Sequence, residues 1–378
     1  MKILHTSDWH VGKVLKGRSR LEEQVAALKG VIDIAVEERP DLVIVAGDLY
    51  DTAQPAPEAT RVVTRALSAL RATGAGVVAI GGNHDNGAAL DALRPWADAA
   101  GITLRGRVSD RREEHVIEGR TKEGESWRCV ALPFLSQRYA IRALEMFELT
   151  EAQAQATYAD HLARLLASLC ESFDQGSVNL ITTHLTVVGG VMGGGEREAH
   201  TILSYAVPAL IFPANAHYVA LGHLHRPQTL PGRCPVRYSG SPLSIDFGEE
   251  ENAPSVSIVE VSADTAAQVR EVPVPVAVPL RTIRGTVDEL SRMEVGDAWL
   301  RVYVSEPPRA GLREQVQELF PRALEIRVDS AAPASQIRAS RVGKSASELF
   351  ADYLVHKGSD DKQTQALFDR LYEEVITS

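Results

Sequence analysis

The stretch "GVVAIGGNHD" at residues 76–85 joins an apolar run to a cluster of polar side chains. Its first five residues carry no charge, which is typical of a buried β-strand. Asn83, His84 and Asp85 follow directly, and such side chains either build a turn or bind metals and move protons. Other parts of the chain with the same pattern decide between these interpretations.

Several further apolar runs also end in polar residues and predict buried strands. They are "KILHTSD" (2–8), "LVIVAGD" (42–48), "VNLITTH" (178–184) and "YVALGH" (218–223). Segments with helical periodicity, 21–38 and 56–74, lie between the early runs. Strands that alternate with helices predict an α/β layered domain.

The five predicted strand ends carry side chains that bind metals. A turn, a helix cap or a surface histidine explains any one motif, but five of the eleven histidines stand at these ends. In open α/β sheets the carboxyl ends of the strands form the ligand site. We therefore predict a metal site made of Asp8, His10, Asp48, Asn83, His184, His223 and His225.

The spacing of these residues favours two metals. Side chains two apart share a face of an extended segment, which applies to Asp-x-His and to His-x-His. Asp48 can bridge two cations with its two oxygens. One metal is then held by Asp8, His10, Asp48 and His225, and the other by Asp48, Asn83, His184 and His223. Mixed nitrogen and oxygen ligands favour Mn, Fe or Zn.

Two such cations, roughly 3.5–4 Å apart, make a hydroxide from water and clamp a phosphate oxygen. The leaving oxygen then needs a proton. His84 adjoins Asn83 and has no metal role, so it is the candidate general acid, with Asp85 as its orienting partner. Asn83 is thus predicted to bind metal while His84 faces the phosphate.

Composition limits the class of protein. The chain has 378 residues, enough for two or three domains, and a formal charge of −10 that argues against a general nucleic-acid coater. An enzyme of nucleic acids stays possible, because a local basic patch can coexist with an acidic whole. The three cysteines are scattered, no apolar stretch reaches about 18 residues, and we expect a cytoplasmic protein without a membrane span.

The rest of the chain suggests additional parts. Residues 105–134 predict a polar hairpin, 139–174 a helical region, and the Val-Pro alternation at 271–280 a linker. Residues 281–329 contain short patterns for strand, helix, strand, helix and strand, which predict a small α+β domain.

Two amphipathic helices are expected at 345–358 and 362–378, after a polar connector. They either cover the protein's own core or form a docking surface for a partner protein. The candidate partner-binding residues are Leu349, Phe350, Tyr353, Leu367, Phe368 and Leu371.

Basic residues follow the first metal motif. Lys13, Lys16 and Arg18 are either contacts for a DNA backbone or part of a solvated loop. The glycine-rich "GGVMGGGE" (189–196) lacks the Lys-Ser/Thr ending of a phosphate-binding P-loop, so any dependence on ATP must come from a partner.

Five motifs together resemble the calcineurin-like metallophosphoesterase superfamily: "DWH", "GD", "GNHD", the lone His184 and "GHLH". The resemblance implies a four-layer αββα sandwich. "MKILHTSDWHVGK", "DLVIVAGDLYDTAQP", "YVALGHLHRPQ" and "VRYSGSPLSIDFGE" are also similar to the nuclease subunits of bacterial complexes that process DNA ends. Some relatives have a histidine where this chain has Asp51, so no catalytic role is assigned there.

This resemblance implies a nuclease domain (1–275), a DNA-capping domain (281–330) and C-terminal helices (342–378) that dock on a coiled-coil ATPase. It also implies two Mn²⁺ per chain, with Mg²⁺, Fe²⁺ or Zn²⁺ as alternatives, and a homodimer within a heterotetramer. The implied activity is cleavage of DNA ends and hairpins in recombination and repair. A small-molecule phosphodiesterase, a phosphatase, or a scaffold that tethers DNA ends are the alternatives, and the chain after residue 280 favours the nuclease.

Overall fold

The computed structural model describes residues 1–109, 111–136, 158–196, 206–275, 278–328, 350–351, 353–354 and 362–377. The predicted helical region at 139–174 lies partly outside this range. Its described part forms α6 (Tyr158–Leu169) and the short helix η2 (Cys170–Ser172). Among the described residues, no helix is long and apolar enough to cross a membrane.

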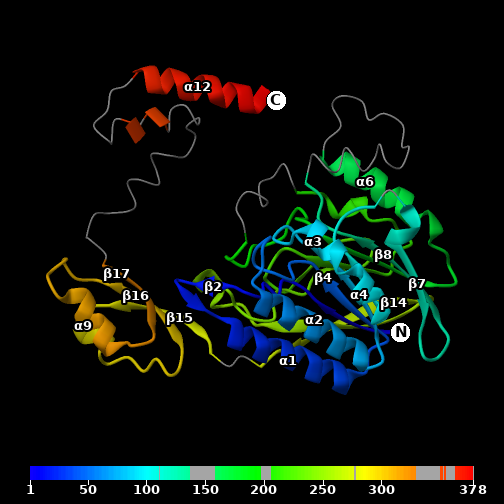
Figure 1. Cartoon of the computed structure of the whole chain (residues 1–378), viewed down its shortest axis with the longest axis horizontal. Coiled ribbons are helices and arrows are strands. Elements are labelled where there is room, and N and C mark those ends of the chain that lie inside the picture. The colour runs from blue at the N-terminus through cyan, green and yellow to red at the C-terminus, as the bar shows by residue number, and fades with distance from the viewer. Residues whose placement is uncertain are drawn as a thin grey trace.

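Two six-stranded sheets form the main body (Figure 1). The first sheet has the order β14 (Thr265–Pro273), β13 (Ser255–Ser262), β1 (Lys2–Thr6), β4 (Leu42–Ala46), β5 (Gly76–Ile80) and β6 (Ile102–Arg105). The second has the order β11 (Gln228–Leu230), β12 (Val236–Tyr238), β10 (Tyr218–Gly222), β9 (Val178–His184), β8 (Ser126–Leu132) and β7 (Val116–Arg120). The strands nearest the centre of each sheet, such as β4 and β9, are buried along their whole length.

Helices cover the outer face of each sheet. The first sheet packs against α1 (Leu21–Glu38), α2 (Pro57–Ala72), α3 (Gly87–Ala92) and α4 (Arg94–Ala99). The second packs against α6, η2 and η4 (Ala209–Ile211). A third apolar cluster, which includes Ile44 and Leu180, fills the space between the sheets. The layers therefore run helix, sheet, sheet, helix, and the predicted four-layer sandwich is confirmed.

The five strands that end in polar motifs do not share one sheet. β1, β4 and β5 belong to the first sheet, and β9 and β10 belong to the second. The two sheets meet closely at this edge, where Nδ1 of His184 donates to the carbonyl of Ala46 at 2.9 Å. The predicted site therefore forms between two sheets.

A small separate sheet follows the main body. β15 (Leu280–Gly285), β16 (Trp299–Val304) and β17 (Ala323–Val328) pair in parallel, with α8 (Val287–Leu290) and α9 (Leu312–Leu319) between them in the chain. Its core includes Leu300, Val302 and Val316. We call residues 280–328 the small unit. The predicted linker is shorter than expected, because its first residues extend strand β14 to Pro273, where an edge strand tolerates proline.

After residue 328, the described residues are 350–351, 353–354 and 362–377. α12 spans Lys362–Thr377, and the ring of Phe368 stacks on that of Phe350 with 4.1 Å between centroids. Tyr353 and Leu367 are exposed. Leu349 and the side chain of Leu371 lie outside the described residues.

Candidate metal centre

The predicted ligands sit on strained turns directly after the strands. Asp8, His10, Asp48 and His223 have positive φ angles of 54°, 45°, 50° and 105°. Residues other than glycine rarely adopt this conformation, and it concentrates at functional sites. The Asp-x-His and His-x-His segments are therefore not extended, contrary to our expectation. Asp8 and His10 nevertheless reach the same group, through turns rather than through an extended strand.

Neighbouring backbone holds these turns together. The N–H of Asp8 donates to the carbonyl of Gly47, and that of His10 to the carbonyl of Asp48, each at 3.0 Å. A Cβ at Gly47 would lie 2.3 Å from Nδ1 of His184, and φ there is +96°. Glycine before Asp48 is thus required both for the turn and for the approach of His184.

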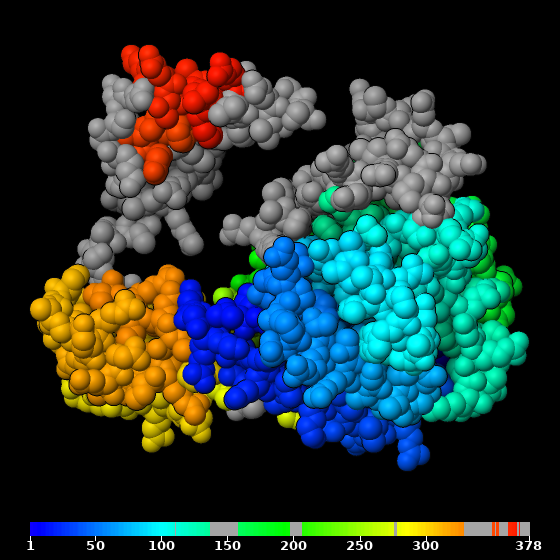
Figure 2. All heavy atoms as spheres, in the orientation of Figure 1, coloured from blue at the N-terminus to red at the C-terminus, as the bar shows by residue number. Residues whose placement is uncertain are grey.

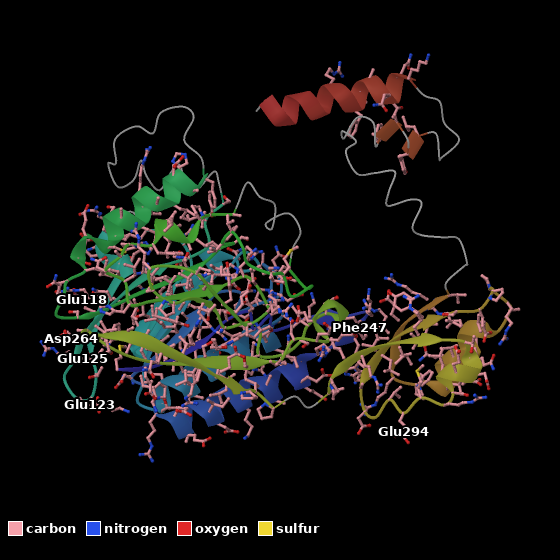
Figure 3. All side chains as sticks on the ribbon, turned by 180° about the vertical axis from the view of Figure 1, so that it is seen from behind. Glu118, Glu123, Glu125, Phe247, Asp264 and Glu294 are labelled. Carbon is pink, nitrogen blue, oxygen red and sulfur yellow. The ribbon has the colours of Figure 1, made fainter. Side chains whose placement is uncertain are left out.

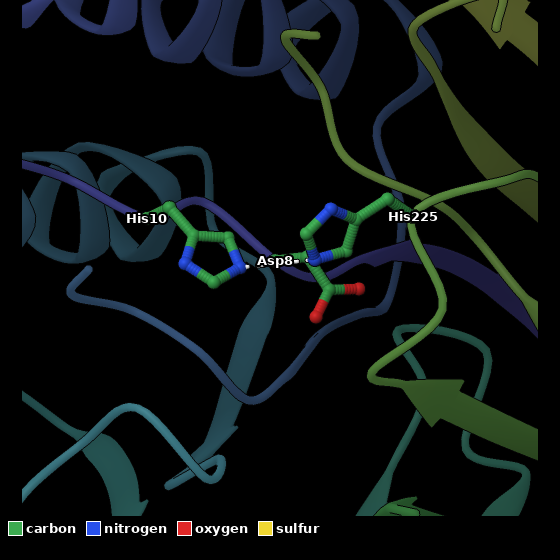
Figure 4. A group of neighbouring side chains, drawn as sticks. All are labelled: Asp8, His10 and His225. Carbon is green, nitrogen blue, oxygen red and sulfur yellow. Dashed lines mark hydrogen bonds between the residues drawn. The ribbon is translucent and has the colours of Figure 1, made fainter. Parts of the chain in front are cut away.

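The first group contains Asp8, His10 and His225, which Figure 4 shows side by side. Their potential ligand atoms all lie within 4.8 Å of one another, and all three side chains are buried. Nε2 of His10 is 3.1 Å from Nε2 of His225. These residues come from the ends of β1 and β10, on opposite sheets.

The second group contains Asn83, His184 and His223. Oδ1 of Asn83 is 2.8 Å from Nε2 of His184 and 2.9 Å from Nδ1 of His223. His223 and His225 thus belong to different groups, although they are only two residues apart. The carboxylates are shared more widely, because Asp8 also clusters with Asp48 and His184, and His84 clusters with His10 and Asp48. The division of the seven ligands between two metals stays a prediction.

Asp48 lies between the two groups. Its Oδ2 is 3.6 Å from Nε2 of His10 and 3.4 Å from Nε2 of His184. Its Oδ1 accepts the backbone N–H of His84 at 2.8 Å. We expected both carboxylate oxygens to bridge the metals. In the structure one oxygen faces both groups while the other fixes the GNHD turn.

The imidazole nitrogens and side-chain oxygens that meet in this site are suited to bind cations. Nδ1 of His184 donates to the Ala46 carbonyl, so Nε2 is the nitrogen that faces the Asn83 oxygen, 2.8 Å away. Without a metal a proton on Nε2 joins the two atoms, and once that proton is lost both the Nε2 lone pair and the amide oxygen can bind a cation. His225 is fixed in the same way, because its Nδ1 lies 2.6 Å from Oε1 of Glu249.

The electrostatics of the site also favour positive charge. Burial disfavours a charged imidazole, yet the Asp48 carboxylate raises the pKa of His184 to about 9. Glu249 likewise outweighs burial and raises the pKa of His225 to about 10. Burial opposes a charged Asp48, but His184 and His10 hold the pKa of that carboxyl well below its usual range. Burial instead lowers the pKa of His10 to about 4, so the carboxylates favour positive charge at His184 and His225 in particular.

His84 and Asp85 have different surroundings from those predicted. Nδ1 of His84 lies 2.8 Å from the backbone carbonyl of Asp51, so this carbonyl orients the ring. The Asp85 carboxylate instead accepts the N–H groups of Leu49, Tyr50 and Gly82, at 3.1, 2.9 and 2.9 Å. It joins the Asp48 loop to the Asn83 loop. The prediction that Asp85 orients His84 was wrong, because backbone donors occupy both of its oxygens.

Two acidic residues at the site, Glu249 and Glu196, were missed, and a third, Asp51, was named without a role. Glu249 contacts His225, Glu196 accepts the backbone N–H of His225 at 2.9 Å, and Oδ1 of Asp51 is 3.5 Å from Nδ1 of His10. Glu196 and Glu249 are distant in sequence from the motif they support. Only the position of Asp51, three residues after Asp48, could have indicated its place.

The predicted DNA-contacting residues separate in the structure. Nζ of Lys13 is 3.3 Å from Asp51, next to the first group. Lys16 pairs with Glu325 at 3.4 Å, and the Arg18 guanidinium lies 3.9 Å from the centre of the Trp299 ring. Lys16 and Arg18 therefore contact the small unit, and only Lys13 lies at the predicted metal centre.

Comparison with known proteins agrees with this geometry. Residues 1–227 match the family described as calcineurin-like phosphoesterase, and residues 276–375 match the one described as type 5 capsule protein repressor C-terminal domain. The chain belongs to the calcineurin-like phosphoesterase family. Enzymes of this family use a dimetal site, and the clustered imidazoles and carboxylates stand where such a site belongs.

Within that family, the chain is similar to proteins named as the D component of the nuclease SbcCD. It is 34% identical over 338 residues to the one from Bacillus subtilis, covering 86% of this chain and 85% of that protein. The Escherichia coli K12 protein is 32% identical over 311 residues, with 82% and 76% covered. The Rhodobacter capsulatus protein is 34% identical over 295 residues, with 74% and 71% covered.

Proposed function

We propose that this chain is a nuclease subunit that hydrolyses DNA phosphodiester bonds, as a double-strand exonuclease and a single-strand or hairpin endonuclease. The observation that carries the proposal is the position of Asp48 Oδ2, within 3.6 Å of imidazole nitrogens from both groups. A bridging carboxylate between two nitrogen-rich groups is the arrangement a two-metal phosphoesterase requires.

Seven side chains would hold two divalent cations, and we infer Mn²⁺, with Mg²⁺, Fe²⁺ or Zn²⁺ as alternatives. Bound there, the cations supply an activated water and neutralise the charge that builds on the phosphate. Asp8, His10, Asp48 and His225 would form one ligand set, and Asp48, Asn83, His184 and His223 the other. Six of these residues are buried and Asn83 is partly exposed, so little bulk water reaches the site and each electrostatic interaction is strengthened.

His84 is the proposed proton donor to the leaving oxygen. The Asp51 carbonyl accepts from Nδ1, which makes Nε2 the nitrogen that transfers the proton. The backbone N–H of His84 is held by Asp48 Oδ1, so the ring is placed relative to the bridging carboxylate. His84 and His10 lie edge to face with 4.5 Å between ring centroids.

A cavity of about 700 Å³ adjoins the second group. It begins at Gly82 and Asn83 and continues past Phe134, Arg94 and Arg107. A cavity of this size accommodates a nucleotide or more beyond the cleaved bond. The aromatic ring provides a stacking surface for a single strand, whereas both guanidinium groups are paired, Arg94 with Glu114 at 2.8 Å and Arg107 with Asp91 at 3.0 Å.

The remaining parts suit partners of the SbcCD type, in DNA end processing, recombination and repair. We propose that residues 1–275 form the nuclease domain, 281–330 a DNA-capping domain, and 342–378 helices that dock on the coiled coil of an SbcC-type ATPase. Phe350 and Phe368, stacked on each other, belong to that docking segment. The assembly is a homodimer within a heterotetramer, in the cytoplasm, and Lys13, which lies beside the first group, contacts DNA.

An assay of three substrates tests the proposal. The purified chain with Mn²⁺ is given a hairpin DNA, a blunt duplex and p-nitrophenyl phosphate, with and without the ATPase and ATP. We expect cleavage of both DNAs, loss of cleavage in Asp48→Ala, and no loss in the control Glu123→Ala at an exposed position. Hydrolysis of the small ester alone, with both DNAs intact, would instead support a small-molecule phosphatase.

A further inference from the structure

The small unit packs directly on the N-terminal part of the main body, as Figure 2 shows. The indole of Trp299 on β16 lies between two guanidinium groups, that of Arg18 at 3.9 Å and that of Arg322 at 5.2 Å from its ring centre. Its neighbours in the buried cluster are Leu15, Phe247 and Leu280. Apolar and cation–π contacts therefore fix Trp299 at this junction.

A series of polar contacts leads from this tryptophan into the main body. Nε1 of Trp299 donates to Oε1 of Glu23 at 2.7 Å, and the other oxygen of Glu23 accepts from Nε of Arg20. Nη1 of Arg20 then donates to the carbonyl of Ser244 at 2.9 Å. Arg20 is only 1% exposed, and a charge so deeply buried depends on its partners.

Ser244 begins the segment that carries Glu249. Oγ of Ser244 donates to the carbonyl of Glu249 at 3.1 Å, and the N–H of Ile245 donates to Oε2 of Glu249 at 2.8 Å. The free end of this carboxylate, Oε1, contacts Nδ1 of His225 at 2.6 Å. The chain of contacts thus ends on a proposed metal ligand.

A second route joins the small unit to the same segment. The short helix η5 (Phe247–Glu249) begins with Phe247, which Figure 3 labels at the junction. The Arg301 guanidinium lies 5.2 Å from the centre of this ring, and Nη2 lies 3.5 Å from the carbonyl of Phe247. Arg301 belongs to β16, as Trp299 does. Both routes therefore start on one strand and reach Glu249.

We propose that Glu249 is a positioning residue for His225, and that the small unit holds Glu249 in place through Trp299 and Arg301. Metal affinity at the first group then depends on docking of the small unit, whereas affinity at the second group does not. This inference rests on the proposed two-metal function.

Glu249 affects metal binding through Nδ1 of His225, the ring nitrogen that does not face His10. Glu249 accepts the proton of Nδ1, which leaves the lone pair on Nε2, the atom that faces His10. A carboxylate at this position also increases the basicity of the imidazole and stops rotation of its ring. His184 receives the same support from the Ala46 carbonyl, which stands at the end of β4 in the main body.

Calorimetric titration of the metal-free full-length chain with MnCl₂ tests the inference. Glu249→Gln should weaken one of two Mn²⁺ sites by about 10–100-fold, and Trp299→Phe should weaken the same site by a smaller factor. Trp299→Phe keeps an aromatic ring, but it removes the N–H donated to Glu23 together with part of the ring surface under Arg18. Trp127→Phe is the matched control for the smaller ring, because the buried Trp127 indole nitrogen has no hydrogen-bond partner among the described residues.

The double variant Trp299→Phe/Glu249→Gln shows whether Trp299 affects metal affinity through Glu249 or independently of it. We expect no further loss beyond Glu249→Gln alone. Electron paramagnetic resonance should show an isolated Mn²⁺ in Glu249→Gln at two equivalents of metal, where the wild type shows a coupled pair. Additive losses, equal weakening of both sites, or wild-type affinity in Trp299→Phe would overturn the inference. A wild-type chain that binds no metal pair would instead overturn the proposed function.

Discussion

Replacement of Gly82 by alanine tests whether the GNHD turn is packed beneath a metal ligand or is an ordinary turn. A Cβ at this position would lie 2.2 Å from Oδ1 of Asp48 and 2.4 Å from its backbone nitrogen. Ordinary contacts begin at 3.4 Å, so Asp48 and the new methyl group must separate by about 1.2 Å. The backbone of Gly82 does not have positive φ, so the effect is steric rather than conformational.

We expect Gly82→Ala to reduce both the stability of the chain and its activity. Overpacking should reduce the free energy of unfolding by about 1–3 kcal/mol, measured by urea denaturation of the metal-free chain. Displacement of the bridging carboxylate by about 1 Å should reduce phosphodiester cleavage by about 100-fold. Gly176→Ala is the control, because its nearest neighbour would be Oδ1 of Asp174 at 3.6 Å. Wild-type stability and Mn²⁺ affinity in Gly82→Ala would refute the packing described above.

Three further predictions follow from individual side chains and segments. Asp85→Asn should lower the free energy of unfolding by about 1–3 kcal/mol in urea, because an amide has one acceptor oxygen for three backbone N–H groups; unchanged stability would contradict its role in joining the two loops. His84→Ala should keep both metals, measured by elemental analysis, while DNA cleavage falls by about 10²–10⁴-fold; full activity would remove His84 from the mechanism. Deletion of residues 345–378 should leave Mn²⁺ affinity unchanged and end co-purification with the ATPase; a truncated chain that still co-purifies would show that docking occurs elsewhere.

The sequence was sufficient to predict that these seven side chains come together, because the signal is local. A buried strand followed by Asp, Asn or His can be recognised in one short segment, and the recurrence of His after four of the five strands reduces the ambiguity of each. The order of layers required the family resemblance, since strand patterns alone do not show that β1 and β9 lie in different sheets.

Other features depend on contacts between distant residues. Glu249 ends the segment "VRYSGSPLSIDFGE", which carries part of the resemblance, but it lies 24 positions from His225 and the segment does not show which ring it contacts. Asp85 was misassigned because its three backbone donors come from loop geometry. Arg18 was grouped with Lys13 as a DNA contact, although Trp299, far along the chain, packs against its guanidinium. The surroundings of Glu249, Asp85 and Arg18 thus depend on contacts that the local sequence does not reveal.

The most direct test of the metal centre is anomalous diffraction from a crystal of the chain grown with Mn²⁺. Two peaks are expected, one among Asp8, His10 and His225 and the other among Asn83, His184 and His223, with Oδ2 of Asp48 between them. A single peak, or peaks remote from Asp48, would contradict a dinuclear centre bridged by this carboxylate.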